Sequence, residues 1–160
     1  MQIKIRAWDK DSETMIYGVG ITPESDGGIP YQIPVNAHDF DQLDYYPNSI
    51  IMLYTGFKDK NGKEIYADDI IRYEYLEDSC WGKAGVYTGH IRFDKGGFEI
   101  VHHGDRIIRY PDGSWYEPSK CDDMKSFMSW AHNVEVIGNR YTHPHLLDGE
   151  EEWTILKKKL

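Results

Sequence analysis

Histidines raise the first question of chemistry in this chain, because seven of them occur and neutral imidazoles are common metal ligands. His102 and His103 are adjacent, so on a strand their side chains point to opposite faces, and one of them could act together with His90 on a paired strand. His143 and His145 share a face, but the proline between them indicates a strand end, and no acid or cysteine is specified nearby. Surface histidines without a metal are the simpler interpretation, and we expect neither a metal nor another cofactor.

Paired acids and a cysteine are the other candidates. Asp68-Asp69 and Asp122-Asp123 could supply two carboxylates for acid–base chemistry or for Mg²⁺. A turn explains the first pair and a helix start explains the second, although an ion at Asp68-Asp69 or at the adjacent histidines stays open. Cys80 could be a nucleophile if a histidine approached it. No Walker loop, GxGxxG, GxSxG or HExxH motif occurs, so we expect a protein that is not an enzyme.

The elements that must position these residues are mostly strands, because apolar and polar side chains alternate along much of the chain. Asn61-Gly62 predicts a tight hairpin turn between strands that end near Phe57 and start near Lys63, since both turn residues tolerate left-handed backbone. The sequence therefore predicts a mainly β protein. Strands are expected over residues 2–8, 15–17, 49–54, 64–66, 70–75, 86–93, 98–102, 105–110 and 134–141.

The remaining segments are predicted to be irregular or helical. Residues 22–48 are rich in proline and allow at most short strands, and residues 115–121 are expected to be irregular. One or two short helices are expected, over residues 122–130 and 150–159, so helix should stay below roughly a quarter of the chain. The predicted core includes six large aliphatic side chains: Ile51, Leu53, Ile65, Ile71, Val136 and Ile137.

Composition and charge restrict the partners. The net charge is −9 and no segment is basic, so we expect no binding to a nucleic-acid backbone. Twelve Tyr and five Trp suit a β-sheet, and some also supply contact area at interfaces. The possible interaction surface consists of Trp81, Trp115, Tyr116 and Trp153.

The cellular setting is predicted from what the chain lacks. Charged residues interrupt any apolar run near the N-terminus, so no signal peptide is expected, and no stretch of about 18 apolar residues could span a membrane. We therefore expect a cytoplasmic protein whose two cysteines, Cys80 and Cys121, remain reduced without a disulfide between them.

Three segments in order along the chain resemble the YopX family of phage and prophage proteins. The first combines Ile3-Lys4-Ile5-Arg6-Ala7-Trp8-Asp9 with Met15-Ile16-Tyr17. The second is Tyr54-Thr55-Gly56-Phe57-Lys58-Asp59-Lys60-Asn61-Gly62-Lys63-Glu64-Ile65-Tyr66. The third is Val136-Ile137-Gly138-Asn139-Arg140-Tyr141 with Pro144 and Leu146-Leu147. Asp68 departs from the pattern, since the family usually has glycine there, but Asp tolerates a left-handed conformation at some cost.

The resemblance implies a small protein encoded by phages and prophages of bacteria, with a β-rich fold and no established enzymatic activity. It divides the chain into an N-terminal β-rich region with a proline-rich insert (residues 1–56), an SH3-like barrel (57–147) and a C-terminal tail (148–160). We expect a non-enzymatic accessory protein that binds an unknown phage or host protein. The alternative is a nucleic-acid-associated protein or an acidic decoy of nucleic acid.

Self-association is the further expectation for this accessory protein. Trp153, Leu156 and Leu160 fall on one stripe of the short C-terminal helix, which is marginal alone and needs a surface to cover. Docking of this helix on the chain's own barrel or on a second copy is expected. A frayed tail is the alternative.

Overall fold

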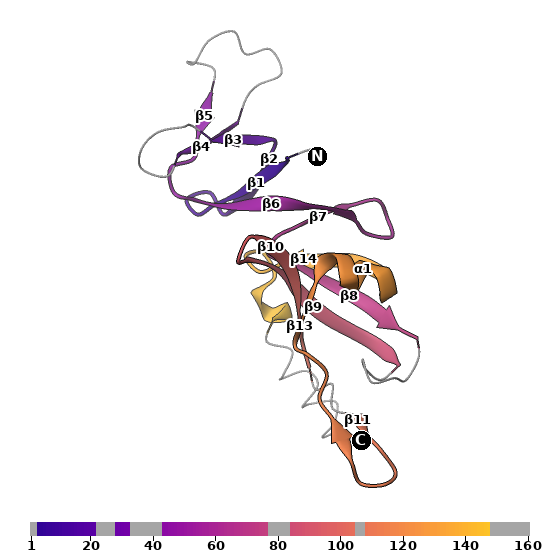
Figure 1. Ribbon diagram of the computed structural model, residues 1–160. Helices are drawn as coiled ribbons and strands as arrows, with labels where there is room; N and C mark the ends of the chain where they lie inside the picture. The colour runs from indigo at the N-terminus through magenta and orange to yellow at the C-terminus, as the bar shows by residue number, and fades with distance from the viewer. Residues whose placement is uncertain (1–2, 22–27, 33–42, 77–83, 105–107, 148–160) are drawn as a thin grey trace. The chain divides into compact units, whose positions relative to one another are not determined.

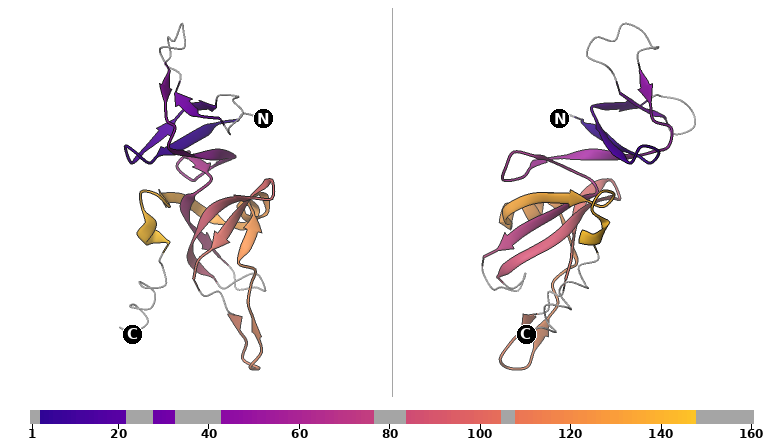
Figure 2. Two further views of the ribbon diagram at one scale, coloured as in Figure 1. Left: turned by 90° about the vertical axis from the view of Figure 1, so that its left-hand side faces the viewer. Right: turned by 180° about the vertical axis from the view of Figure 1, so that it is seen from behind.

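The computed structural model describes residues 3–21, 28–32, 43–76, 84–104 and 108–147. These residues fall into two compact units, Met1–Gly56 and Phe57–Leu160, and each unit is described by itself. Strands make up 57% of the described residues and helices 8%, so the predicted mainly β fold and its low helix content are confirmed. The antiparallel sheets are curled, and within the second unit the curled sheet forms a half-barrel (Figures 1 and 2).

The first unit contains two small antiparallel sheets. In one sheet β1 (Ile5–Asp9) pairs with both β2 (Thr14–Tyr17) and β6 (Ser49–Lys58), whose last two residues belong to the second unit. The other sheet has the order β3 (Val19–Ile21), β4 (Pro30–Gln32) and β5 (Asp44–Tyr45). The two strands predicted over residues 2–8 and 15–17 therefore form a hairpin. The short strands β4 and β5 lie within residues 22–48, the segment predicted to be irregular with at most short strands.

Two details of this unit differ from the sequence-based predictions. Arg6, which alternates with the apolar residues of the first strand and would be expected to face solvent, is only 1% exposed. In β6 the buried side chain is Met52, whereas Ile51 and Leu53, which point to the other face, are only partly buried. The fully buried position falls on Met52 because apolar residues occupy both faces of this strand, and alternation then gives no direction.

The second unit is built on a five-stranded antiparallel sheet. Its strand order is β13-β10-β9-β8-β14, so the last strand of the sequence pairs with the first strand of the sheet. The bounds are β8 (Asp69–Tyr75), β9 (Gly85–Asp94), β10 (Gly97–His102), β13 (Cys121–Asp123) and β14 (His132–Asn139). Cys121 thus lies in a strand rather than in the predicted irregular segment, because Val101 of β10 pairs with it.

The shorter elements of this unit lie before, between and after the strands of the sheet. They are β7 (Glu64–Tyr66), β11 (Ile108–Arg109), β12 (Trp115–Tyr116), helix α1 (Met124–Trp130) and the 3₁₀ turn η2 (Pro144–Leu146). Helix α1 begins where the carboxylate of Asp123 accepts a hydrogen bond from the Ser126 backbone N–H, at 3.0 Å. No helix in the described ranges combines the length and apolarity of a membrane span.

The core of the second unit lies between α1 and the sheet. Phe127 of α1 and Tyr73 of β8 are both fully buried and meet edge to face, with ring centroids 4.9 Å apart. Of the six predicted core residues, Ile65 and Ile71 are fully buried, but Val136 and Ile137 are only partly so. The buried members of this cluster are Ile65, Ile71, Tyr73, Ile91, Ile100, Met124, Phe127 and Val134.

The turn predicted at Asn61-Gly62 is present but has a different form. The Asp59 N–H donates to the Lys63 carbonyl, and the Gly62 N–H donates to the Asp59 carbonyl, which closes a three-residue loop between β6 and β7. Within residues 59–63, only Gly62 has a positive φ, of 80°. This is the arrangement of a type I turn followed by a bulge glycine, so Asn61 needs no left-handed conformation.

Replacing Gly62 by valine should therefore lower the free energy of unfolding by about 1 kcal/mol or more, because a β-branched residue resists positive φ. No atom lies within 4 Å of the position that a Cβ would take, so the loss would come from backbone strain and not from a clash. Urea denaturation measures this change, with Asn61→Val as the matched control. Equal stabilities of the two variants would contradict the prediction.

Candidate functional site

The predicted interaction surface is described in part. Trp81 and Trp153 lie outside the described residues. Trp115 and Tyr116 form β12, which pairs with β11, and their exposed fractions are 65% and 40%. We call residues 108–116 the aromatic ribbon, since Tyr110 in its turn is also exposed.

The turn of the aromatic ribbon is held by its own side chains. The Asp112 carboxylate accepts hydrogen bonds from the Ser114 N–H at 2.8 Å and the Ser114 hydroxyl at 2.5 Å. These bonds also lower the pKa of Asp112. The Tyr110 N–H donates to the Ser114 carbonyl, which closes the turn. The exposed aromatic side chains thus stand on a formed turn.

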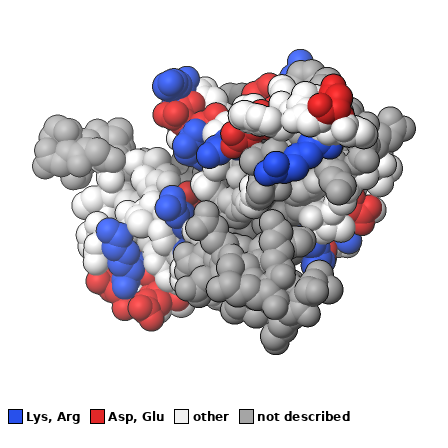
Figure 3. Space-filling view, turned by 90° about the horizontal axis from the view of Figure 1, so that it is seen from below, with Lys and Arg blue, Asp and Glu red and all other residues white. Residues whose placement is uncertain are grey.

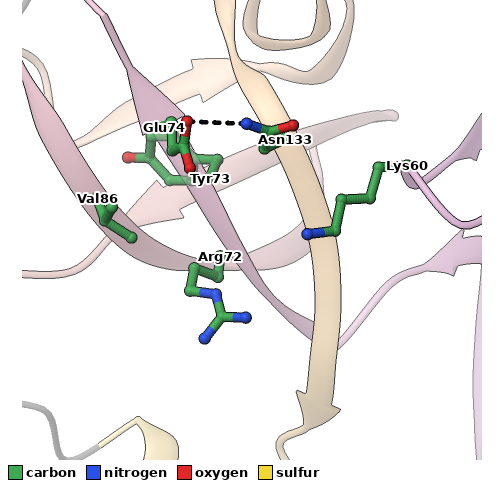
Figure 4. A pocket seen from close by; sticks show the side chains of 6 residues that line it. All are labelled: Lys60, Arg72, Tyr73, Glu74, Val86 and Asn133. Carbon is green, nitrogen blue, oxygen red and sulfur yellow. Dashed lines mark hydrogen bonds between the residues drawn. The ribbon is translucent and has the colours of Figure 1, made fainter.

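A hollow of about 280 Å³ lies over β8, β9 and the start of β14 (Figure 4). Its cations, Lys60 and Arg72, both approach the carboxylate of Glu135, at 3.4 and 2.6 Å. Its carboxylate, Glu74, accepts a hydrogen bond from the Asn133 side chain at 2.8 Å. Each charge therefore has an opposite or polar partner already, and the hollow offers no surplus charge to an ionic ligand.

The adjacent histidines point to opposite faces, as predicted, and enter two different clusters. His102 is buried between Tyr73 and Asp122: its Nδ1 lies 2.5 Å from the Tyr73 hydroxyl and its Nε2 lies 2.7 Å from the Asp122 carboxylate. In a neutral His102 the Nε2–H donates to Asp122 while Nδ1 accepts from Tyr73. This chain of bonds joins β8, β10 and β13, and of its three side chains only the Asp122 carboxylate reaches solvent, in part.

His103 meets His90 instead. The His103 Nε2 lies 2.7 Å from the His90 Nδ1, and the ring centroids are 5.0 Å apart. Burial, followed by the charge of His103, lowers the pKa of His90 to about 4. Burial also lowers the pKa of His103. Among the described residues, no three His, Cys, Asp or Glu side chains are grouped to hold a metal ion.

The paired acids have separate structural partners. Asp68 has a φ of 67° and accepts a hydrogen bond from the Tyr141 hydroxyl at 2.7 Å, whereas Asp69 is buried and accepts one from the Tyr66 N–H. Asp122 bonds His102, and Asp123 caps α1. The turn interpretation fits the backbone of Asp68, and the helix-start interpretation fits Asp123, but the bonds of Asp68 to Tyr141 and of Asp122 to His102 join distant segments and were not predicted.

The two cysteines are not equally described. Cys121 is a free thiol of intermediate exposure, and the Arg92 guanidinium lies 3.6 Å from its sulfur. Cys80 lies outside the described residues, so the reduced state predicted for both thiols stays a prediction.

The comparison with family models finds a match to the YopX protein family over residues 4–148, which is most of the chain. The chain belongs to the YopX family. A comparison with curated proteins finds no match. Among solved structures, the chain is similar to protein yopX from Bacillus subtilis, with 20% identity, a TM-score of 0.56, and coverage of 90% of this chain and 97% of that one. It is also similar to protein EF1440 from Enterococcus faecalis, with 23% identity, the same TM-score, and coverage of 92% and 99%.

The second and third YopX-like segments of the sequence meet in space at Asp59, whose role the sequence analysis did not foresee. One carboxylate oxygen accepts hydrogen bonds from the N–H groups of Asn61 and Lys63, at 2.8 and 2.9 Å. The other accepts one from the Val136 N–H at 3.0 Å, from a strand 77 residues away. Burial acts to raise the pKa of Asp59, but the bonds from Val136, Lys63 and Asn61 outweigh it and hold the pKa below its usual value.

The YopX-like glycine at position 138 also has a packing role. A Cβ at Gly138 would lie 2.6 Å from the Nδ1 of His143, so the ring of this histidine occupies the space that any other side chain needs. The segment after β14 can therefore fold back over the strand only because this position has no side chain.

Proposed function

We propose that this member of the YopX family is a non-catalytic phage or prophage accessory protein. It acts in the bacterial cytoplasm by binding a protein partner, and the aromatic ribbon is its contact surface. The observation that carries the proposal is the exposure of Trp115 and Tyr116 on a paired strand. Trp and Tyr are enriched among the residues that dominate binding energy in protein interfaces.

The turn of the ribbon supports this role. The hydrogen bonds within residues 110–114 fix the backbone between the aromatic residues before any partner binds. A contact surface that is ordered in advance loses less conformational entropy on binding. Exposed aromatic side chains on such a turn are therefore suited to enter pockets of a partner protein.

The charge of the chain favours a protein over a nucleic acid as the partner. A net charge of −9 repels a phosphate backbone. On the face in Figure 3 the basic and acidic side chains of the described residues lie interspersed, and no continuous basic track is visible. Bases could still stack on exposed aromatic rings, so single-stranded nucleic acid is the alternative that the experiment must separate.

The test is affinity capture of the tagged protein from infected host lysate, with and without nuclease. The double variant Trp115→Ser, Tyr116→Ser is compared with Phe93→Ser, which removes an aromatic side chain of similar exposure elsewhere in the same unit. We expect a captured protein that survives nuclease and that binds the double variant at least about 30-fold more weakly, since dominant interface residues contribute 2 kcal/mol or more.

Three outcomes would contradict the proposal. Capture that nuclease abolishes would point to nucleic acid. Equal capture by the double variant and the wild type would remove the ribbon from the interface. A mass in light scattering that falls with the double variant, without any captured host or phage protein, would identify the partner as a second copy of the chain.

A further inference from the structure

The His90–His103 pair is not used by the proposed contact surface, and its geometry has a consequence of its own. His90 lies on β9 and His103 directly follows β10, and the pairing of His90 with Val101 puts the two rings on one face as diagonal neighbours. The contact of 2.7 Å joins two ring nitrogens. Such a contact requires that one nitrogen donates a proton and the other offers its lone pair, so two doubly protonated rings cannot keep it.

Charged groups face this pair from each neighbouring element. Arg140, after β14, and Arg92, on β9, act against a positive charge on His90, whereas Asp68, in the turn before β8, favours one. His102 acts against a charge on His103. Cations thus outnumber the single carboxylate around the pair, and protonation is opposed by burial and by these charges together.

Asp68 connects the pair to the end of β14. Its N–H donates to the Ile91 carbonyl at 2.8 Å, and its own carbonyl accepts from the Arg140 N–H at 3.0 Å. Its carboxylate accepts from the Tyr141 hydroxyl and lies 3.6 Å from the Arg140 guanidinium. Asp68 therefore holds Arg140 and Tyr141, and its carboxylate also favours a positive charge on His90.

We infer that the His90–His103 pair is an acid-sensitive clasp: while both rings are neutral, Asp68 holds Arg140 and Tyr141, and when the pair gains protons, Asp68 releases them. On release, the imidazolium rings separate, and the Asp68 carboxylate exchanges the Tyr141 hydroxyl for the positive charge of His90, which it favours. No bond other than hydrogen bonds breaks in this change, so raising the pH restores the clasp.

The sign of the effect follows from the lowered pKa values. Between the ordinary histidine pKa of 6.5 and about 4 for His90, the unfolded chain binds protons that the native clasp does not bind. The stability contribution is present above pH 6.5 and is lost as the pH falls. One pKa unit is tenfold in an equilibrium constant. For a half-buried group we therefore expect the equilibrium constant for folding to fall about 30- to 300-fold on acidification.

The experiment compares the wild type with the double variant His90→Asn, His103→Gln. The Asn nitrogen or oxygen replaces Nδ1 and the Gln amide replaces Nε2, so a hydrogen bond can persist but cannot be protonated. His132→Gln, at an exposed histidine of β14, is the matched control. Urea denaturation from pH 7.5 to 4.5 should show the additional 30- to 300-fold loss in the wild type and in the control, and its absence in the double variant.

Two measurements on the wild type keep the inference testable if the double variant does not fold. Imidazole ¹⁵N spectra should show that His90 stays neutral until well below pH 6. Hydrogen exchange should show the protection factor of the Arg140 N–H falling at least about tenfold by pH 4.5. Titration of His90 near pH 6.5, or identical pH profiles of wild type and double variant, would overturn the clasp, and unchanged protection of Arg140 would overturn the release.

Discussion

Replacing Phe127 by alanine should lower the free energy of unfolding by about 3–5 kcal/mol, the range for large aromatic-to-alanine changes in a core. The ring is fully buried and meets Tyr73 and Trp130 at centroid distances of 4.9 and 5.1 Å. Helix α1 has only seven residues, too few to be stable without tertiary packing. Loss of this side chain should therefore detach the helix as well as leave a cavity.

Urea denaturation followed by tryptophan fluorescence measures this loss. Lys125→Ala, at an exposed position of the same helix, is the matched control and should change stability by less than about 0.5 kcal/mol. A Phe127→Ala protein that is as stable as the control would show that α1 does not close the core.

Replacing Asp59 by alanine should lower the free energy of unfolding by about 2–4 kcal/mol, because three backbone N–H groups lose their acceptor at once. Asp59 is 7% exposed, so water replaces these bonds only in part. Asp59→Asn keeps one oxygen acceptor and should lose about half as much. The matched control is Asp94→Ala, which removes an exposed carboxylate at the solvent-facing end of β9.

The pH dependence gives Asp59 a second signature. Its folded-state pKa lies below the ordinary value of 3.8, so its contribution is present above that pH and is lost as the pH falls through the folded-state pKa. Asp59→Asn should therefore lose this part of the acid dependence below about pH 4. An Asp59→Ala protein with wild-type stability would mean that the two YopX-like segments are held together by other contacts.

Alternation explains why much of the second unit could be predicted from the sequence. Tyr73 and Ile71 lie on the inner face of β8, as their spacing indicates, and Arg72 lies on the outer face. The same rule separated His102 from His103 before any register was known. Alternation does not identify the buried face where a strand is apolar on both faces, as around Met52. It also fails where a strand is covered on both faces, as at Ile70.

The contacts that define the polar clusters could not be predicted, because they depend on register between distant strands. The link from Asp59 to Val136 crosses 77 residues, and the link from Asp68 to Tyr141 crosses 73. Turn-forming residues such as Asn61 and Gly62 indicate where the chain reverses direction, but they do not indicate which distant strand lies next to the turn. For Asp59 the sequence indicates only its place beside a turn, where it bonds Asn61 and Lys63, and not its contact with Val136.

The strand order β13-β10-β9-β8-β14 also has a consequence for the growing polypeptide on the ribosome. Strand β8 can pair with β9 soon after both emerge from the ribosome. Its other edge stays unpaired until β14 has been synthesised, because Val136 of β14 pairs with Ile71 of β8. Until translation reaches this point, a nascent chain carries an open strand edge beside apolar side chains, which is a template for aggregation. Completion of this sheet is therefore tied to the synthesis of β14, and a chain stopped before residue 132 should require chaperones or be degraded.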